Sequence, residues 1–327
     1  MDLNAATGAT LNAAATSAAL VLLQLVTFLV FAPFLAATIR RTKALLQSRR
    51  GPGLLQPYRD LIKWWAKQPL ESNASGPVSR YAPAVVLGAV LTAALLIPFA
   101  ASRAPLLGWG DMFVVVGLFA AARFALALAA LDAGGAFGGM GSSRDVAISA
   151  LAEPGLVLAL AGAAIAANSS DLGAISAFGV SQGVGLLGPA HLLAAAAFAL
   201  IVVAETGHYP VDNPDTHLEL TMIHEGMLIE ASGRSLATLV FASELKLVVL
   251  AVLFSAVFFP FGSATEIAAG PIAVGLLTGL AKMLVVGQAL ALLDGSIAKF
   301  RLLRVPDLLG LVSLLALTGL AMRMLLP

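Results

Sequence analysis

A dense group of acidic and histidine side chains lies between two long apolar stretches, at residues 205–230. The whole chain is 59% hydrophobic and only 11% charged, so this concentration of ionisable groups is exceptional. Carboxylates beside hydrocarbon are costly. A set of them can take up and pass on protons, because low dielectric and neighbouring charges shift the pKa values of the carboxylates. The group comprises Glu205, His208, Asp212, Asp215, His217, Glu219, His224, Glu225 and Glu230.

Two prolines divide this acidic segment into a turn and a helix. Pro210 and Pro214 favour a turn. Residues 216–231 are then predicted to be helical, with Thr216 and Glu219 at the spacing of a capping box. Apolar residues are interspersed among the charges, which argues against the alternative of a fully solvated loop whose charges have no role.

A metal centre in this chain is not supported. His224-Glu225 begins a His-Glu-x-x-His motif, but Leu228 occupies the place of the second histidine. The chain has no Cys, which excludes a Cys-ligated iron–sulfur cluster within it. The formal net charge of +1 gives no indication of nucleic acid binding. We therefore expect no metal or cofactor bound by this chain.

Glu153, Lys246 and Lys282 are further ionisable residues inside apolar stretches. Glu153 lies about two turns into one of them, and either Arg144 or Arg123 is a candidate partner. Lys246 and Lys282 lie near the middle of two others, and a buried lysine needs a partner or a wet cavity. The alternative for both lysines is a purely structural ion pair, or snorkelling in the case of Lys246.

The apolar stretches predict an all-α integral membrane protein. Eight of them are long enough to cross a hydrocarbon core about 30 Å thick as helices. We find neither an internal repeat nor a soluble appendage, so residues 1–327 are predicted to form a single membrane domain in the lipid bilayer. The predicted spans lie near 17–39, 82–102, 112–131, 147–168, 189–206, 236–260, 271–293 and 307–325.

Basic residues predict the orientation. Fourteen Lys and Arg residues fall in the loops after the first, third, fifth and seventh spans, against only Arg103 and Arg323 on the opposite side. Because cytoplasmic loops are enriched in basic residues, both termini are expected outside, and the acidic segment becomes an ordered third cytoplasmic loop.

Two other cytoplasmic segments carry patterns. In the first loop, apolar residues recur at helical spacing over 54–67 with the charges off that stripe, which predicts a short amphipathic helix at the interface. The basic turn before it, 49–52, is suited to anionic lipid or a partner subunit. The Gly-rich segment 134–145 lacks the lysine of a phosphate-binding loop, and we interpret it as a tight turn with close helix packing.

Several of these motifs together resemble one family. Arg49-Arg50-Gly51-Pro52, then Leu55-Gln56-Pro57 and Asp60-x-x-Lys63, resemble the first cytoplasmic loop of the subunit 1 family of respiratory complex I, the heel subunit of its membrane arm. The acidic segment is similar to that family's third cytoplasmic loop. Details such as Asp212-Asn213-Pro214 and 298–307 resemble the membrane-bound NiFe-hydrogenase branch, that of formate hydrogenlyase subunit 4.

The resemblance implies a function and partners. It implies a membrane anchor and coupling subunit, not catalytic alone, that links electron transfer in a peripheral arm to proton or sodium translocation. The NiFe centre and iron–sulfur clusters would lie in partner subunits, a hydrogenase-like large subunit and an iron–sulfur small subunit. Antiporter-like membrane subunits would be neighbours in a prokaryotic cytoplasmic (inner) membrane.

The resemblance also implies roles for residues. Redox turnover in the docked arm is hypothesised to shift the third-loop carboxylates between protonation states, and buried groups would pass that shift to a neighbouring subunit. The coupling residues are Glu205, Asp212, Glu219, Glu225, Glu230, Glu153, Arg144, Lys246 and Lys282. The docking residues are Arg49, Arg50, Gln56, Asp60, Lys63 and His208, the last at a position where the family usually has Arg.

Three alternatives remain open. The first is a quinone-site subunit of NADH:quinone oxidoreductase, against which Asn213-Pro214 and Thr216-His217 favour the hydrogenase branch. The second is a stand-alone secondary transporter, which the missing repeat disfavours. The third is a structural anchor, in which the carboxylates would be dispensable.

Overall fold

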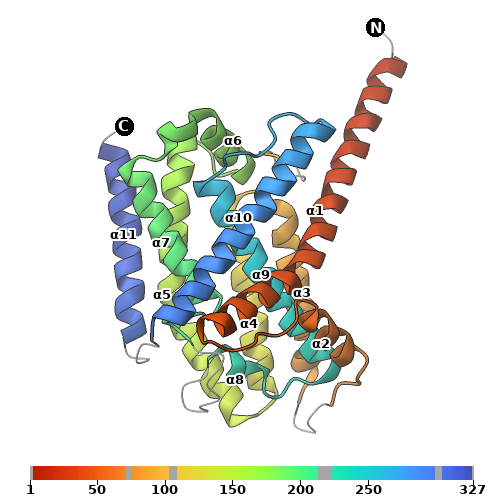
Figure 1. Cartoon of the computed structure of the whole chain (residues 1–327), viewed down its shortest axis with the longest axis vertical. Helices are drawn as coiled ribbons and strands as arrows, with labels where there is room; N and C mark the ends of the chain where they lie inside the picture. Colours follow the sequence, from red (N-terminus) through yellow and green to blue (C-terminus); the bar gives the residue numbers. More distant parts are fainter. Residues whose placement is uncertain (1–2, 71–74, 103–108, 213–222, 299–303, 326–327) are drawn as a thin grey trace.

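The computed structural model describes residues 3–70, 75–102, 109–212, 223–298 and 304–325. Within these ranges the regular elements are helices, as predicted for an all-α membrane protein (Figure 1). They are α1 Leu3–Leu46, α2 Gln56–Trp65, α3 Pro77–Leu96, α4 Met112–Asp132, α5 Ala136–Ala167, α6 Leu172–Gln182, the 3-10 turn η1 Gly183–Leu186, α7 Pro189–Glu205, α8 His224–Leu228, α9 Gly233–Phe258, α10 Ala269–Ser296 and α11 Val305–Leu325.

The membrane spans are confirmed. In the described part of the chain, seven helices are long and apolar enough to cross a bilayer, and the number is eight when the bent pair formed by α6–η1 and α7 is counted as one span. Both termini lie at the end of the molecule that carries α6, whereas α2 and α8 lie at the opposite end (Figure 1). An even number of crossings explains why the two ends of the chain emerge on the same side.

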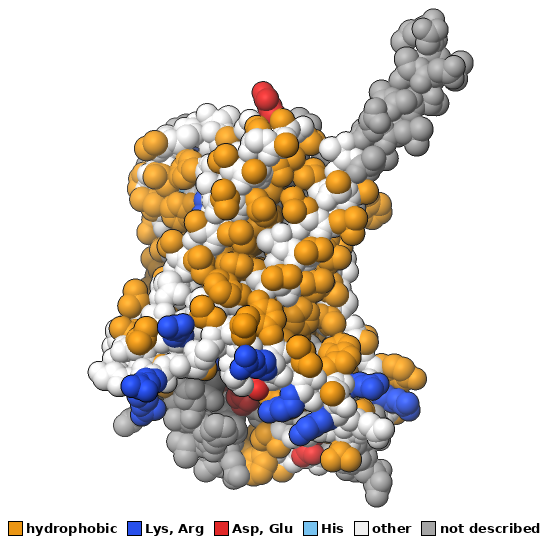
Figure 2. All heavy atoms as spheres, turned by 45° about the vertical axis from the view of Figure 1, so that its right-hand side comes forward, with side chains coloured by type: hydrophobic (Ala, Val, Ile, Leu, Met, Phe, Trp, Pro, Cys, Tyr) orange, Lys and Arg blue, Asp and Glu red, His pale blue; other side chains and the backbone are white. Residues whose placement is uncertain are grey.

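Apolar and basic side chains occupy different parts of the surface. On the face shown in Figure 2, hydrophobic side chains cover the middle of the molecule, and Lys and Arg side chains gather at its lower end. That end holds α2 and α8 (Figure 1). An apolar girdle with a basic rim on one side is the pattern of a multi-pass membrane protein.

Helix α9 lies at the centre of the bundle and packs against α1, α3, α7 and α10. Its apolar window is 67% buried, far more than in the other spans. Near one end, the rings of Phe198, Phe254 and Phe258 pack with centroids 5.4–6.0 Å apart. A helix with neighbours on every side places its ionisable residues inside the protein, away from lipid.

The Gly-rich segment is the predicted tight turn only at its start, where residues 133 and 134 form a turn and Gly134 has a φ of +72°. Residues from Ala136 onward form the first turns of α5, which runs on without interruption to Ala167. Its glycines serve close approach instead: a Cβ at Gly141 would lie 2.9 Å from the carbonyl oxygen of Ile223, next to α8. Neighbouring helices supply packing that outweighs the poor intrinsic helix propensity of glycine.

Two other expectations need correction. Helix α6 lies between two predicted spans, in a segment for which we predict no helix, and the Asp171 side chain caps it by accepting a hydrogen bond from the Gly173 amide. Of the helix predicted for 216–231, the part from His224 to Leu228 forms α8 and 229–231 are not helical, whereas 216–222 lie outside the described residues. The capping box that includes Glu219 lies outside the described residues.

Candidate functional site: an intramembrane charge cluster

Arg123 of α4 is the centre of a buried cluster of ion pairs. Its guanidinium, in a side chain only 9% exposed, contacts Glu153 of α5 and Glu205, the last residue of α7. Its Nε lies 3.9 Å from Oδ2 of Asp145, also on α5. One cation therefore serves three carboxylates from two helices, an arrangement that satisfies charges that would otherwise be very costly in hydrocarbon.

Lys246 of α9 approaches the same carboxylate from the other side. Its Nζ lies 2.7 Å from Glu205 Oε2 and 3.2 Å from the Glu205 backbone oxygen. The carbonyls at the end of a helix lack intrahelical partners and carry partial negative charge, so an ammonium group there satisfies both the carbonyl and the carboxylate. Glu205 is thus held between two cations from α4 and α9.

The cluster continues into the third loop through His224 at the start of α8. One ring nitrogen, Nε2, lies 3.5 Å from Asp145, and the other, Nδ1, lies 3.3 Å from Asp212. The His224 backbone N–H also donates to Asp212, at 3.3 Å. A neutral imidazole has one N–H, so His224 donates to both carboxylates only when it is protonated. The histidine therefore links the loop carboxylate to the cluster around Arg123.

A second ionic group anchors the start of the third loop, at His208 and Tyr209, to α10. His208 Nδ1 lies 2.7 Å from Oδ2 of Asp294, near the end of α10, and the Tyr209 amide donates to Oδ1 at 2.9 Å. Lys43 of α1 lies 3.4 Å from the same Asp294 carboxylate. The structure therefore places the predicted docking residue His208 against a buried carboxylate, with 13% of its side chain exposed.

A third pair joins α1 to α9. Arg40 Nη2 lies 3.1 Å from Glu244 Oε1. The Glu244 side chain is 6% exposed, and its other oxygen, Oε2, has no hydrogen-bond partner among the described residues. A buried carboxylate oxygen without a donor is costly, so this position is suited to a bound polar group that donates a hydrogen bond.

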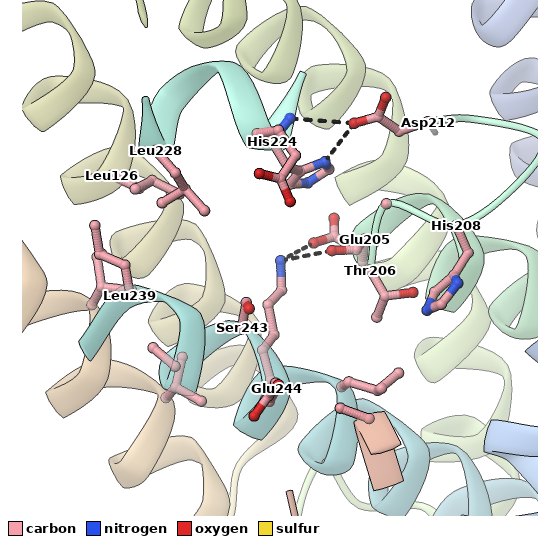
Figure 3. Close-up of a pocket in the computed structure, with 18 of the residues that line it drawn as sticks. Leu126, Glu205, Thr206, His208, Asp212, His224, Leu228, Leu239, Ser243 and Glu244 are labelled. Carbon is pink, nitrogen blue, oxygen red and sulfur yellow. Dashed lines mark hydrogen bonds and ion pairs between the residues drawn. The ribbon is translucent and has the colours of Figure 1, made fainter. Parts of the chain in front are cut away.

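All three ionic groups border one cavity of about 440 Å³. Figure 3 shows Leu126, Leu228 and Leu239 on one side of it, and Glu205, His208 and the Asp212–His224 pair around the rest. A cavity with several titratable walls can hold water and connect groups that lie too far apart for a direct hydrogen bond. The arrangement is suited to relaying charge between the third loop and the interior of the bundle.

The predicted coupling residues separate into two sets. Glu153, Glu205, Asp212 and Lys246 meet in the cluster, and the exposed Glu225 lines the cavity. Arg144, Glu230 and Lys282 lie away from the cluster and the cavity. Glu219 lies outside the described residues.

Their positions are as follows. Arg144 is partly exposed, with Nη2 3.9 Å from Met140 Sδ, and Arg123 is the observed partner of Glu153. Glu230 lies against Gly135 at the start of α5, where a Cβ on that glycine would meet its carboxylate. Lys282 is a residue of α10 and does not line the cavity.

Several charged residues of the site were missed by the sequence reasoning: Arg40, Lys43, Asp145, Glu244 and Asp294. Glu244 carried a signal, because it interrupts an apolar span two residues before Lys246. Asp294 lies just beyond the predicted end of its span, at 293, so its position in the sequence was a weaker indication of a site. In the described residues no group of three or more His, Cys, Asp or Glu side chains is arranged to hold a metal ion.

The predicted docking residues of the first loop lie on or beside α2. Gln56 donates to Asp60 at 3.0 Å, and Lys63 lies 3.7 Å from the same carboxylate. Arg49 and Arg50 are exposed. Their role in docking stays a prediction.

Helix α2 is also tied to the chain around it. The Tyr58 hydroxyl donates to the Val30 carbonyl, and Arg234 Nε, at the start of α9, donates to the Trp65 carbonyl at 3.2 Å. The first and third loops therefore meet at one end of the molecule.

Comparisons with known proteins agree with this fold. A family model described as NADH dehydrogenase matches residues 18–325. Formate hydrogenlyase subunit 4 of Escherichia coli (strain K12) is 35% identical over 285 residues, which cover 86% of this chain and 90% of that protein. Hydrogenase-4 component C of the same organism is 34% identical over 282 residues, with coverages of 86% and 88%.

More distant similarities extend the picture. One of the NADH-quinone oxidoreductase subunits of Koribacter versatilis (strain Ellin345) is 28% identical over 211 residues, covering 59% of this chain and 49% of that protein. Among solved structures, a chain of the membrane-bound sulfane sulfur reductase, an archaeal respiratory membrane complex, superposes with a TM-score of 0.78 and 20% identity. The match covers 93% of this chain and 99% of that chain, and it shows a shared fold.

Proposed function

This chain belongs to the NADH dehydrogenase family, and we propose that it is the membrane anchor and coupling subunit of a formate hydrogenlyase-like or energy-converting NiFe-hydrogenase complex. The observation that carries the proposal is the near full-length similarity to formate hydrogenlyase subunit 4 and hydrogenase-4 component C. The buried charge cluster is a second support, because a passive anchor has no need of so many carboxylates inside a bundle.

In this proposal, the basic end of the molecule faces the cytoplasm and both chain termini face outward from a prokaryotic inner membrane. The peripheral arm, a hydrogenase-like large subunit and an iron–sulfur small subunit, docks on the end that holds α2. Arg49, Arg50 and Lys63 are exposed there and supply positive charge for an acidic partner surface. Antiporter-like subunits lie beside the chain in the membrane.

The coupling step begins at the third loop. Redox turnover in the docked arm moves or protonates Asp212 and its partner His224. Because His224 also contacts Asp145, a change in its charge alters how strongly Arg123 is held by that carboxylate. The loop thereby signals to the cluster without a long movement of the backbone.

The cluster holds more carboxylates than cations, so that binding of one proton changes its ion pairing. Four carboxylates, Asp145, Glu153, Glu205 and Asp212, face the fixed cations Arg123 and Lys246. Protonation of His224 or of one carboxylate therefore redistributes the pairing of the others, because they share the same two cations. Glu205 and Lys246 then present the altered charge toward the centre of the bundle.

A quinone-site subunit of a complex I-type oxidoreductase is the second candidate function. The cavity favours it, since part of its wall is apolar, with Val86, Val90 and Leu126 beside charged groups. Against it, similarity to the NADH-quinone oxidoreductase relative is lower and covers less of the chain than similarity to the two hydrogenase relatives.

One experiment separates these functions. The tagged chain is purified from its native membrane in mild detergent, and the co-purifying subunits are identified by mass spectrometry. The proposal expects a nickel-containing large subunit and hydrogen evolution from a reduced dye. A set of complex I subunits with quinone reductase activity and no nickel would move the function to the second candidate, and purification without any redox subunit would contradict both.

A further inference from the structure

Lys282 lies near the middle of α10. Among the residues that the structure describes, its ammonium group makes neither a hydrogen bond nor an ion pair. Its side chain is only partly covered by the protein. A lysine at this depth in a bilayer is costly unless it finds a partner or water. The position therefore requires an explanation that the isolated chain does not provide.

Snorkelling does not supply that explanation. At 1.5 Å per residue the 28 residues of α10 extend about 42 Å, so that position 282 lies roughly 20 Å along the helix from either end. A lysine side chain has a stem of four carbons and covers only a fraction of that distance. For the same reason a lipid phosphate, which stays at the bilayer surface, does not reach it.

The other cations inside the bundle contrast with Lys282. Arg123 contacts three carboxylates, Lys246 contacts Glu205, and Lys43 contacts Asp294. The chain thus pairs these buried cations with its own acids. Lys282 lies on a helix whose described carboxylate, Asp294, is twelve positions away and is already engaged by His208.

The face of α10 beside Lys282 has no cover from the described part of this chain. Val274, Leu277, Val285 and Leu292 form an apolar stripe along it, each more than half exposed. The opposite face is the one that packs inside the bundle, where Gly275, Gly279 and Gly287 approach Ala100, Phe99 and Leu35. Lys282 lies at the border between these two faces, where an approaching helix would contact it.

We propose that this face of α10 contacts a membrane-spanning helix of a neighbouring subunit, and that this helix carries an Asp or Glu at the depth of Lys282. The proposal rests on the proposed membership in a membrane complex and adds the site of contact and the chemistry of the partner. Charge complementarity identifies the occupant, because only another protein brings a carboxylate to the middle of a bilayer.

The first test is photo-crosslinking in native membranes. A photoreactive amino acid is placed at position 285, on the exposed stripe one turn from Lys282. A matched control is placed at position 314, another exposed apolar position on α11. The expected result is a crosslink from position 285 to a membrane subunit whose crosslinked span contains an Asp or Glu, with a different pattern from position 314.

Lipid as the only product at position 285 would overturn the inference. If the peripheral subunits still co-purified in that case, the proposed function would stand and only the docking site would fall. Absence of every redox subunit from the purified sample would instead overturn the proposed function.

The second test changes the charge. Lys282→Met is expected to lower retention of the crosslinked subunit in detergent by about tenfold or more, because the partner carboxylate is left unpaired, whereas Lys282→Arg retains it. Exchange of charges, Lys282→Glu with Lys at the partner's acidic position, is expected to restore retention. Equal retention by Lys282→Met and the unaltered chain would contradict the inference. If the Lys282→Met chain does not accumulate in the membrane, the crosslink from position 285 in a chain that keeps Lys282 tests the inference by itself.

Discussion

The cluster around Arg123 and the face of α10 around Lys282 solve the same physical problem in opposite ways. Both place cations among apolar helices, where an unpaired charge is expensive. In the cluster, α4, α5, α7 and α9 bring acids and bases together, so both cations find their counter-charges within one chain. On α10 the cation is present and its counter-charge is not among the described residues.

This difference indicates what each region is for. A self-contained cluster keeps its geometry whichever subunits are present, and its charge can be changed through the third loop that touches it. The energetic cost of a cation without a counter-charge depends on the residues that a neighbouring subunit places beside it, so such a cation is suited to a contact between subunits. The following changes test the contrast, from the largest expected effect to the smallest.

Replacing Arg123 is expected to have the largest effect. Arg123→Gln leaves Asp145, Glu153 and Glu205 with one fewer cation, and removal of one partner from a buried ionic group typically costs about 3–5 kcal/mol. We expect poor accumulation in the membrane, a lowered Tm in detergent and loss of coupled ion movement. The control is Arg144→Gln, since Arg144 is partly exposed on the adjoining helix α5 and is not the observed partner of Glu153. A larger loss with Arg144→Gln would contradict the pairing described for Glu153.

Glu205→Gln should separate coupling from folding. The substitution keeps the shape of the side chain and its capacity to accept hydrogen bonds, but it removes the charge shared by Arg123 and Lys246. We expect ion translocation to fall about tenfold or more while dye-driven hydrogen evolution persists, because redox chemistry takes place in other subunits. Translocation is followed with a pH- or potential-sensitive dye in vesicles. Unchanged translocation would assign the cluster a structural role only.

Lys282→Met is expected to act in the opposite direction on the isolated chain. Removing a lysine from the centre of a membrane helix relieves about 2.5–3.5 kcal/mol on the translocon scale. The chain purified by itself should therefore keep or raise its Tm, while its retention of the neighbouring subunit falls. A marked drop in Tm of the isolated chain would show that Lys282 has a partner within it, and the contrast drawn above would be wrong.

Neutralising the outer carboxylates should have the smallest effect. Glu225 is exposed at the cavity, where solvent screens its charge, and Glu219 lies outside the described residues. Glu219→Gln and Glu225→Gln together are expected to lower ion pumping by a few-fold, with hydrogen evolution retained; Glu225→Gln by itself should change the Tm little, since an exposed charge contributes about 0–1 kcal/mol. If pumping and hydrogen evolution both stay at full rate, these two residues take no part in coupling.

The local pattern of the sequence determined the class of the protein, its family and the place of its acidic third loop. Apolar length sets the spans, because a helix needs about 20 apolar residues to cross the bilayer, and this property requires no knowledge of neighbours. The concentration of acids at 205–230 located the third loop, and short motifs around Arg49 and Asp212 identified the family. All of these signals lie within contiguous stretches of the chain.

Only the tertiary structure decided which charges meet. Arg123 and Glu205 are 82 positions apart, and Lys43 and Asp294 even further, so their pairing depends on how whole helices are rotated and packed. The same packing placed the Gly-rich residues from Ala136 onward in the start of α5, and it selected Arg123 over Arg144 as the partner of Glu153. A one-dimensional pattern shows that a charge is buried, whereas the choice of its partner, or the lack of one, is a property of the assembled bundle.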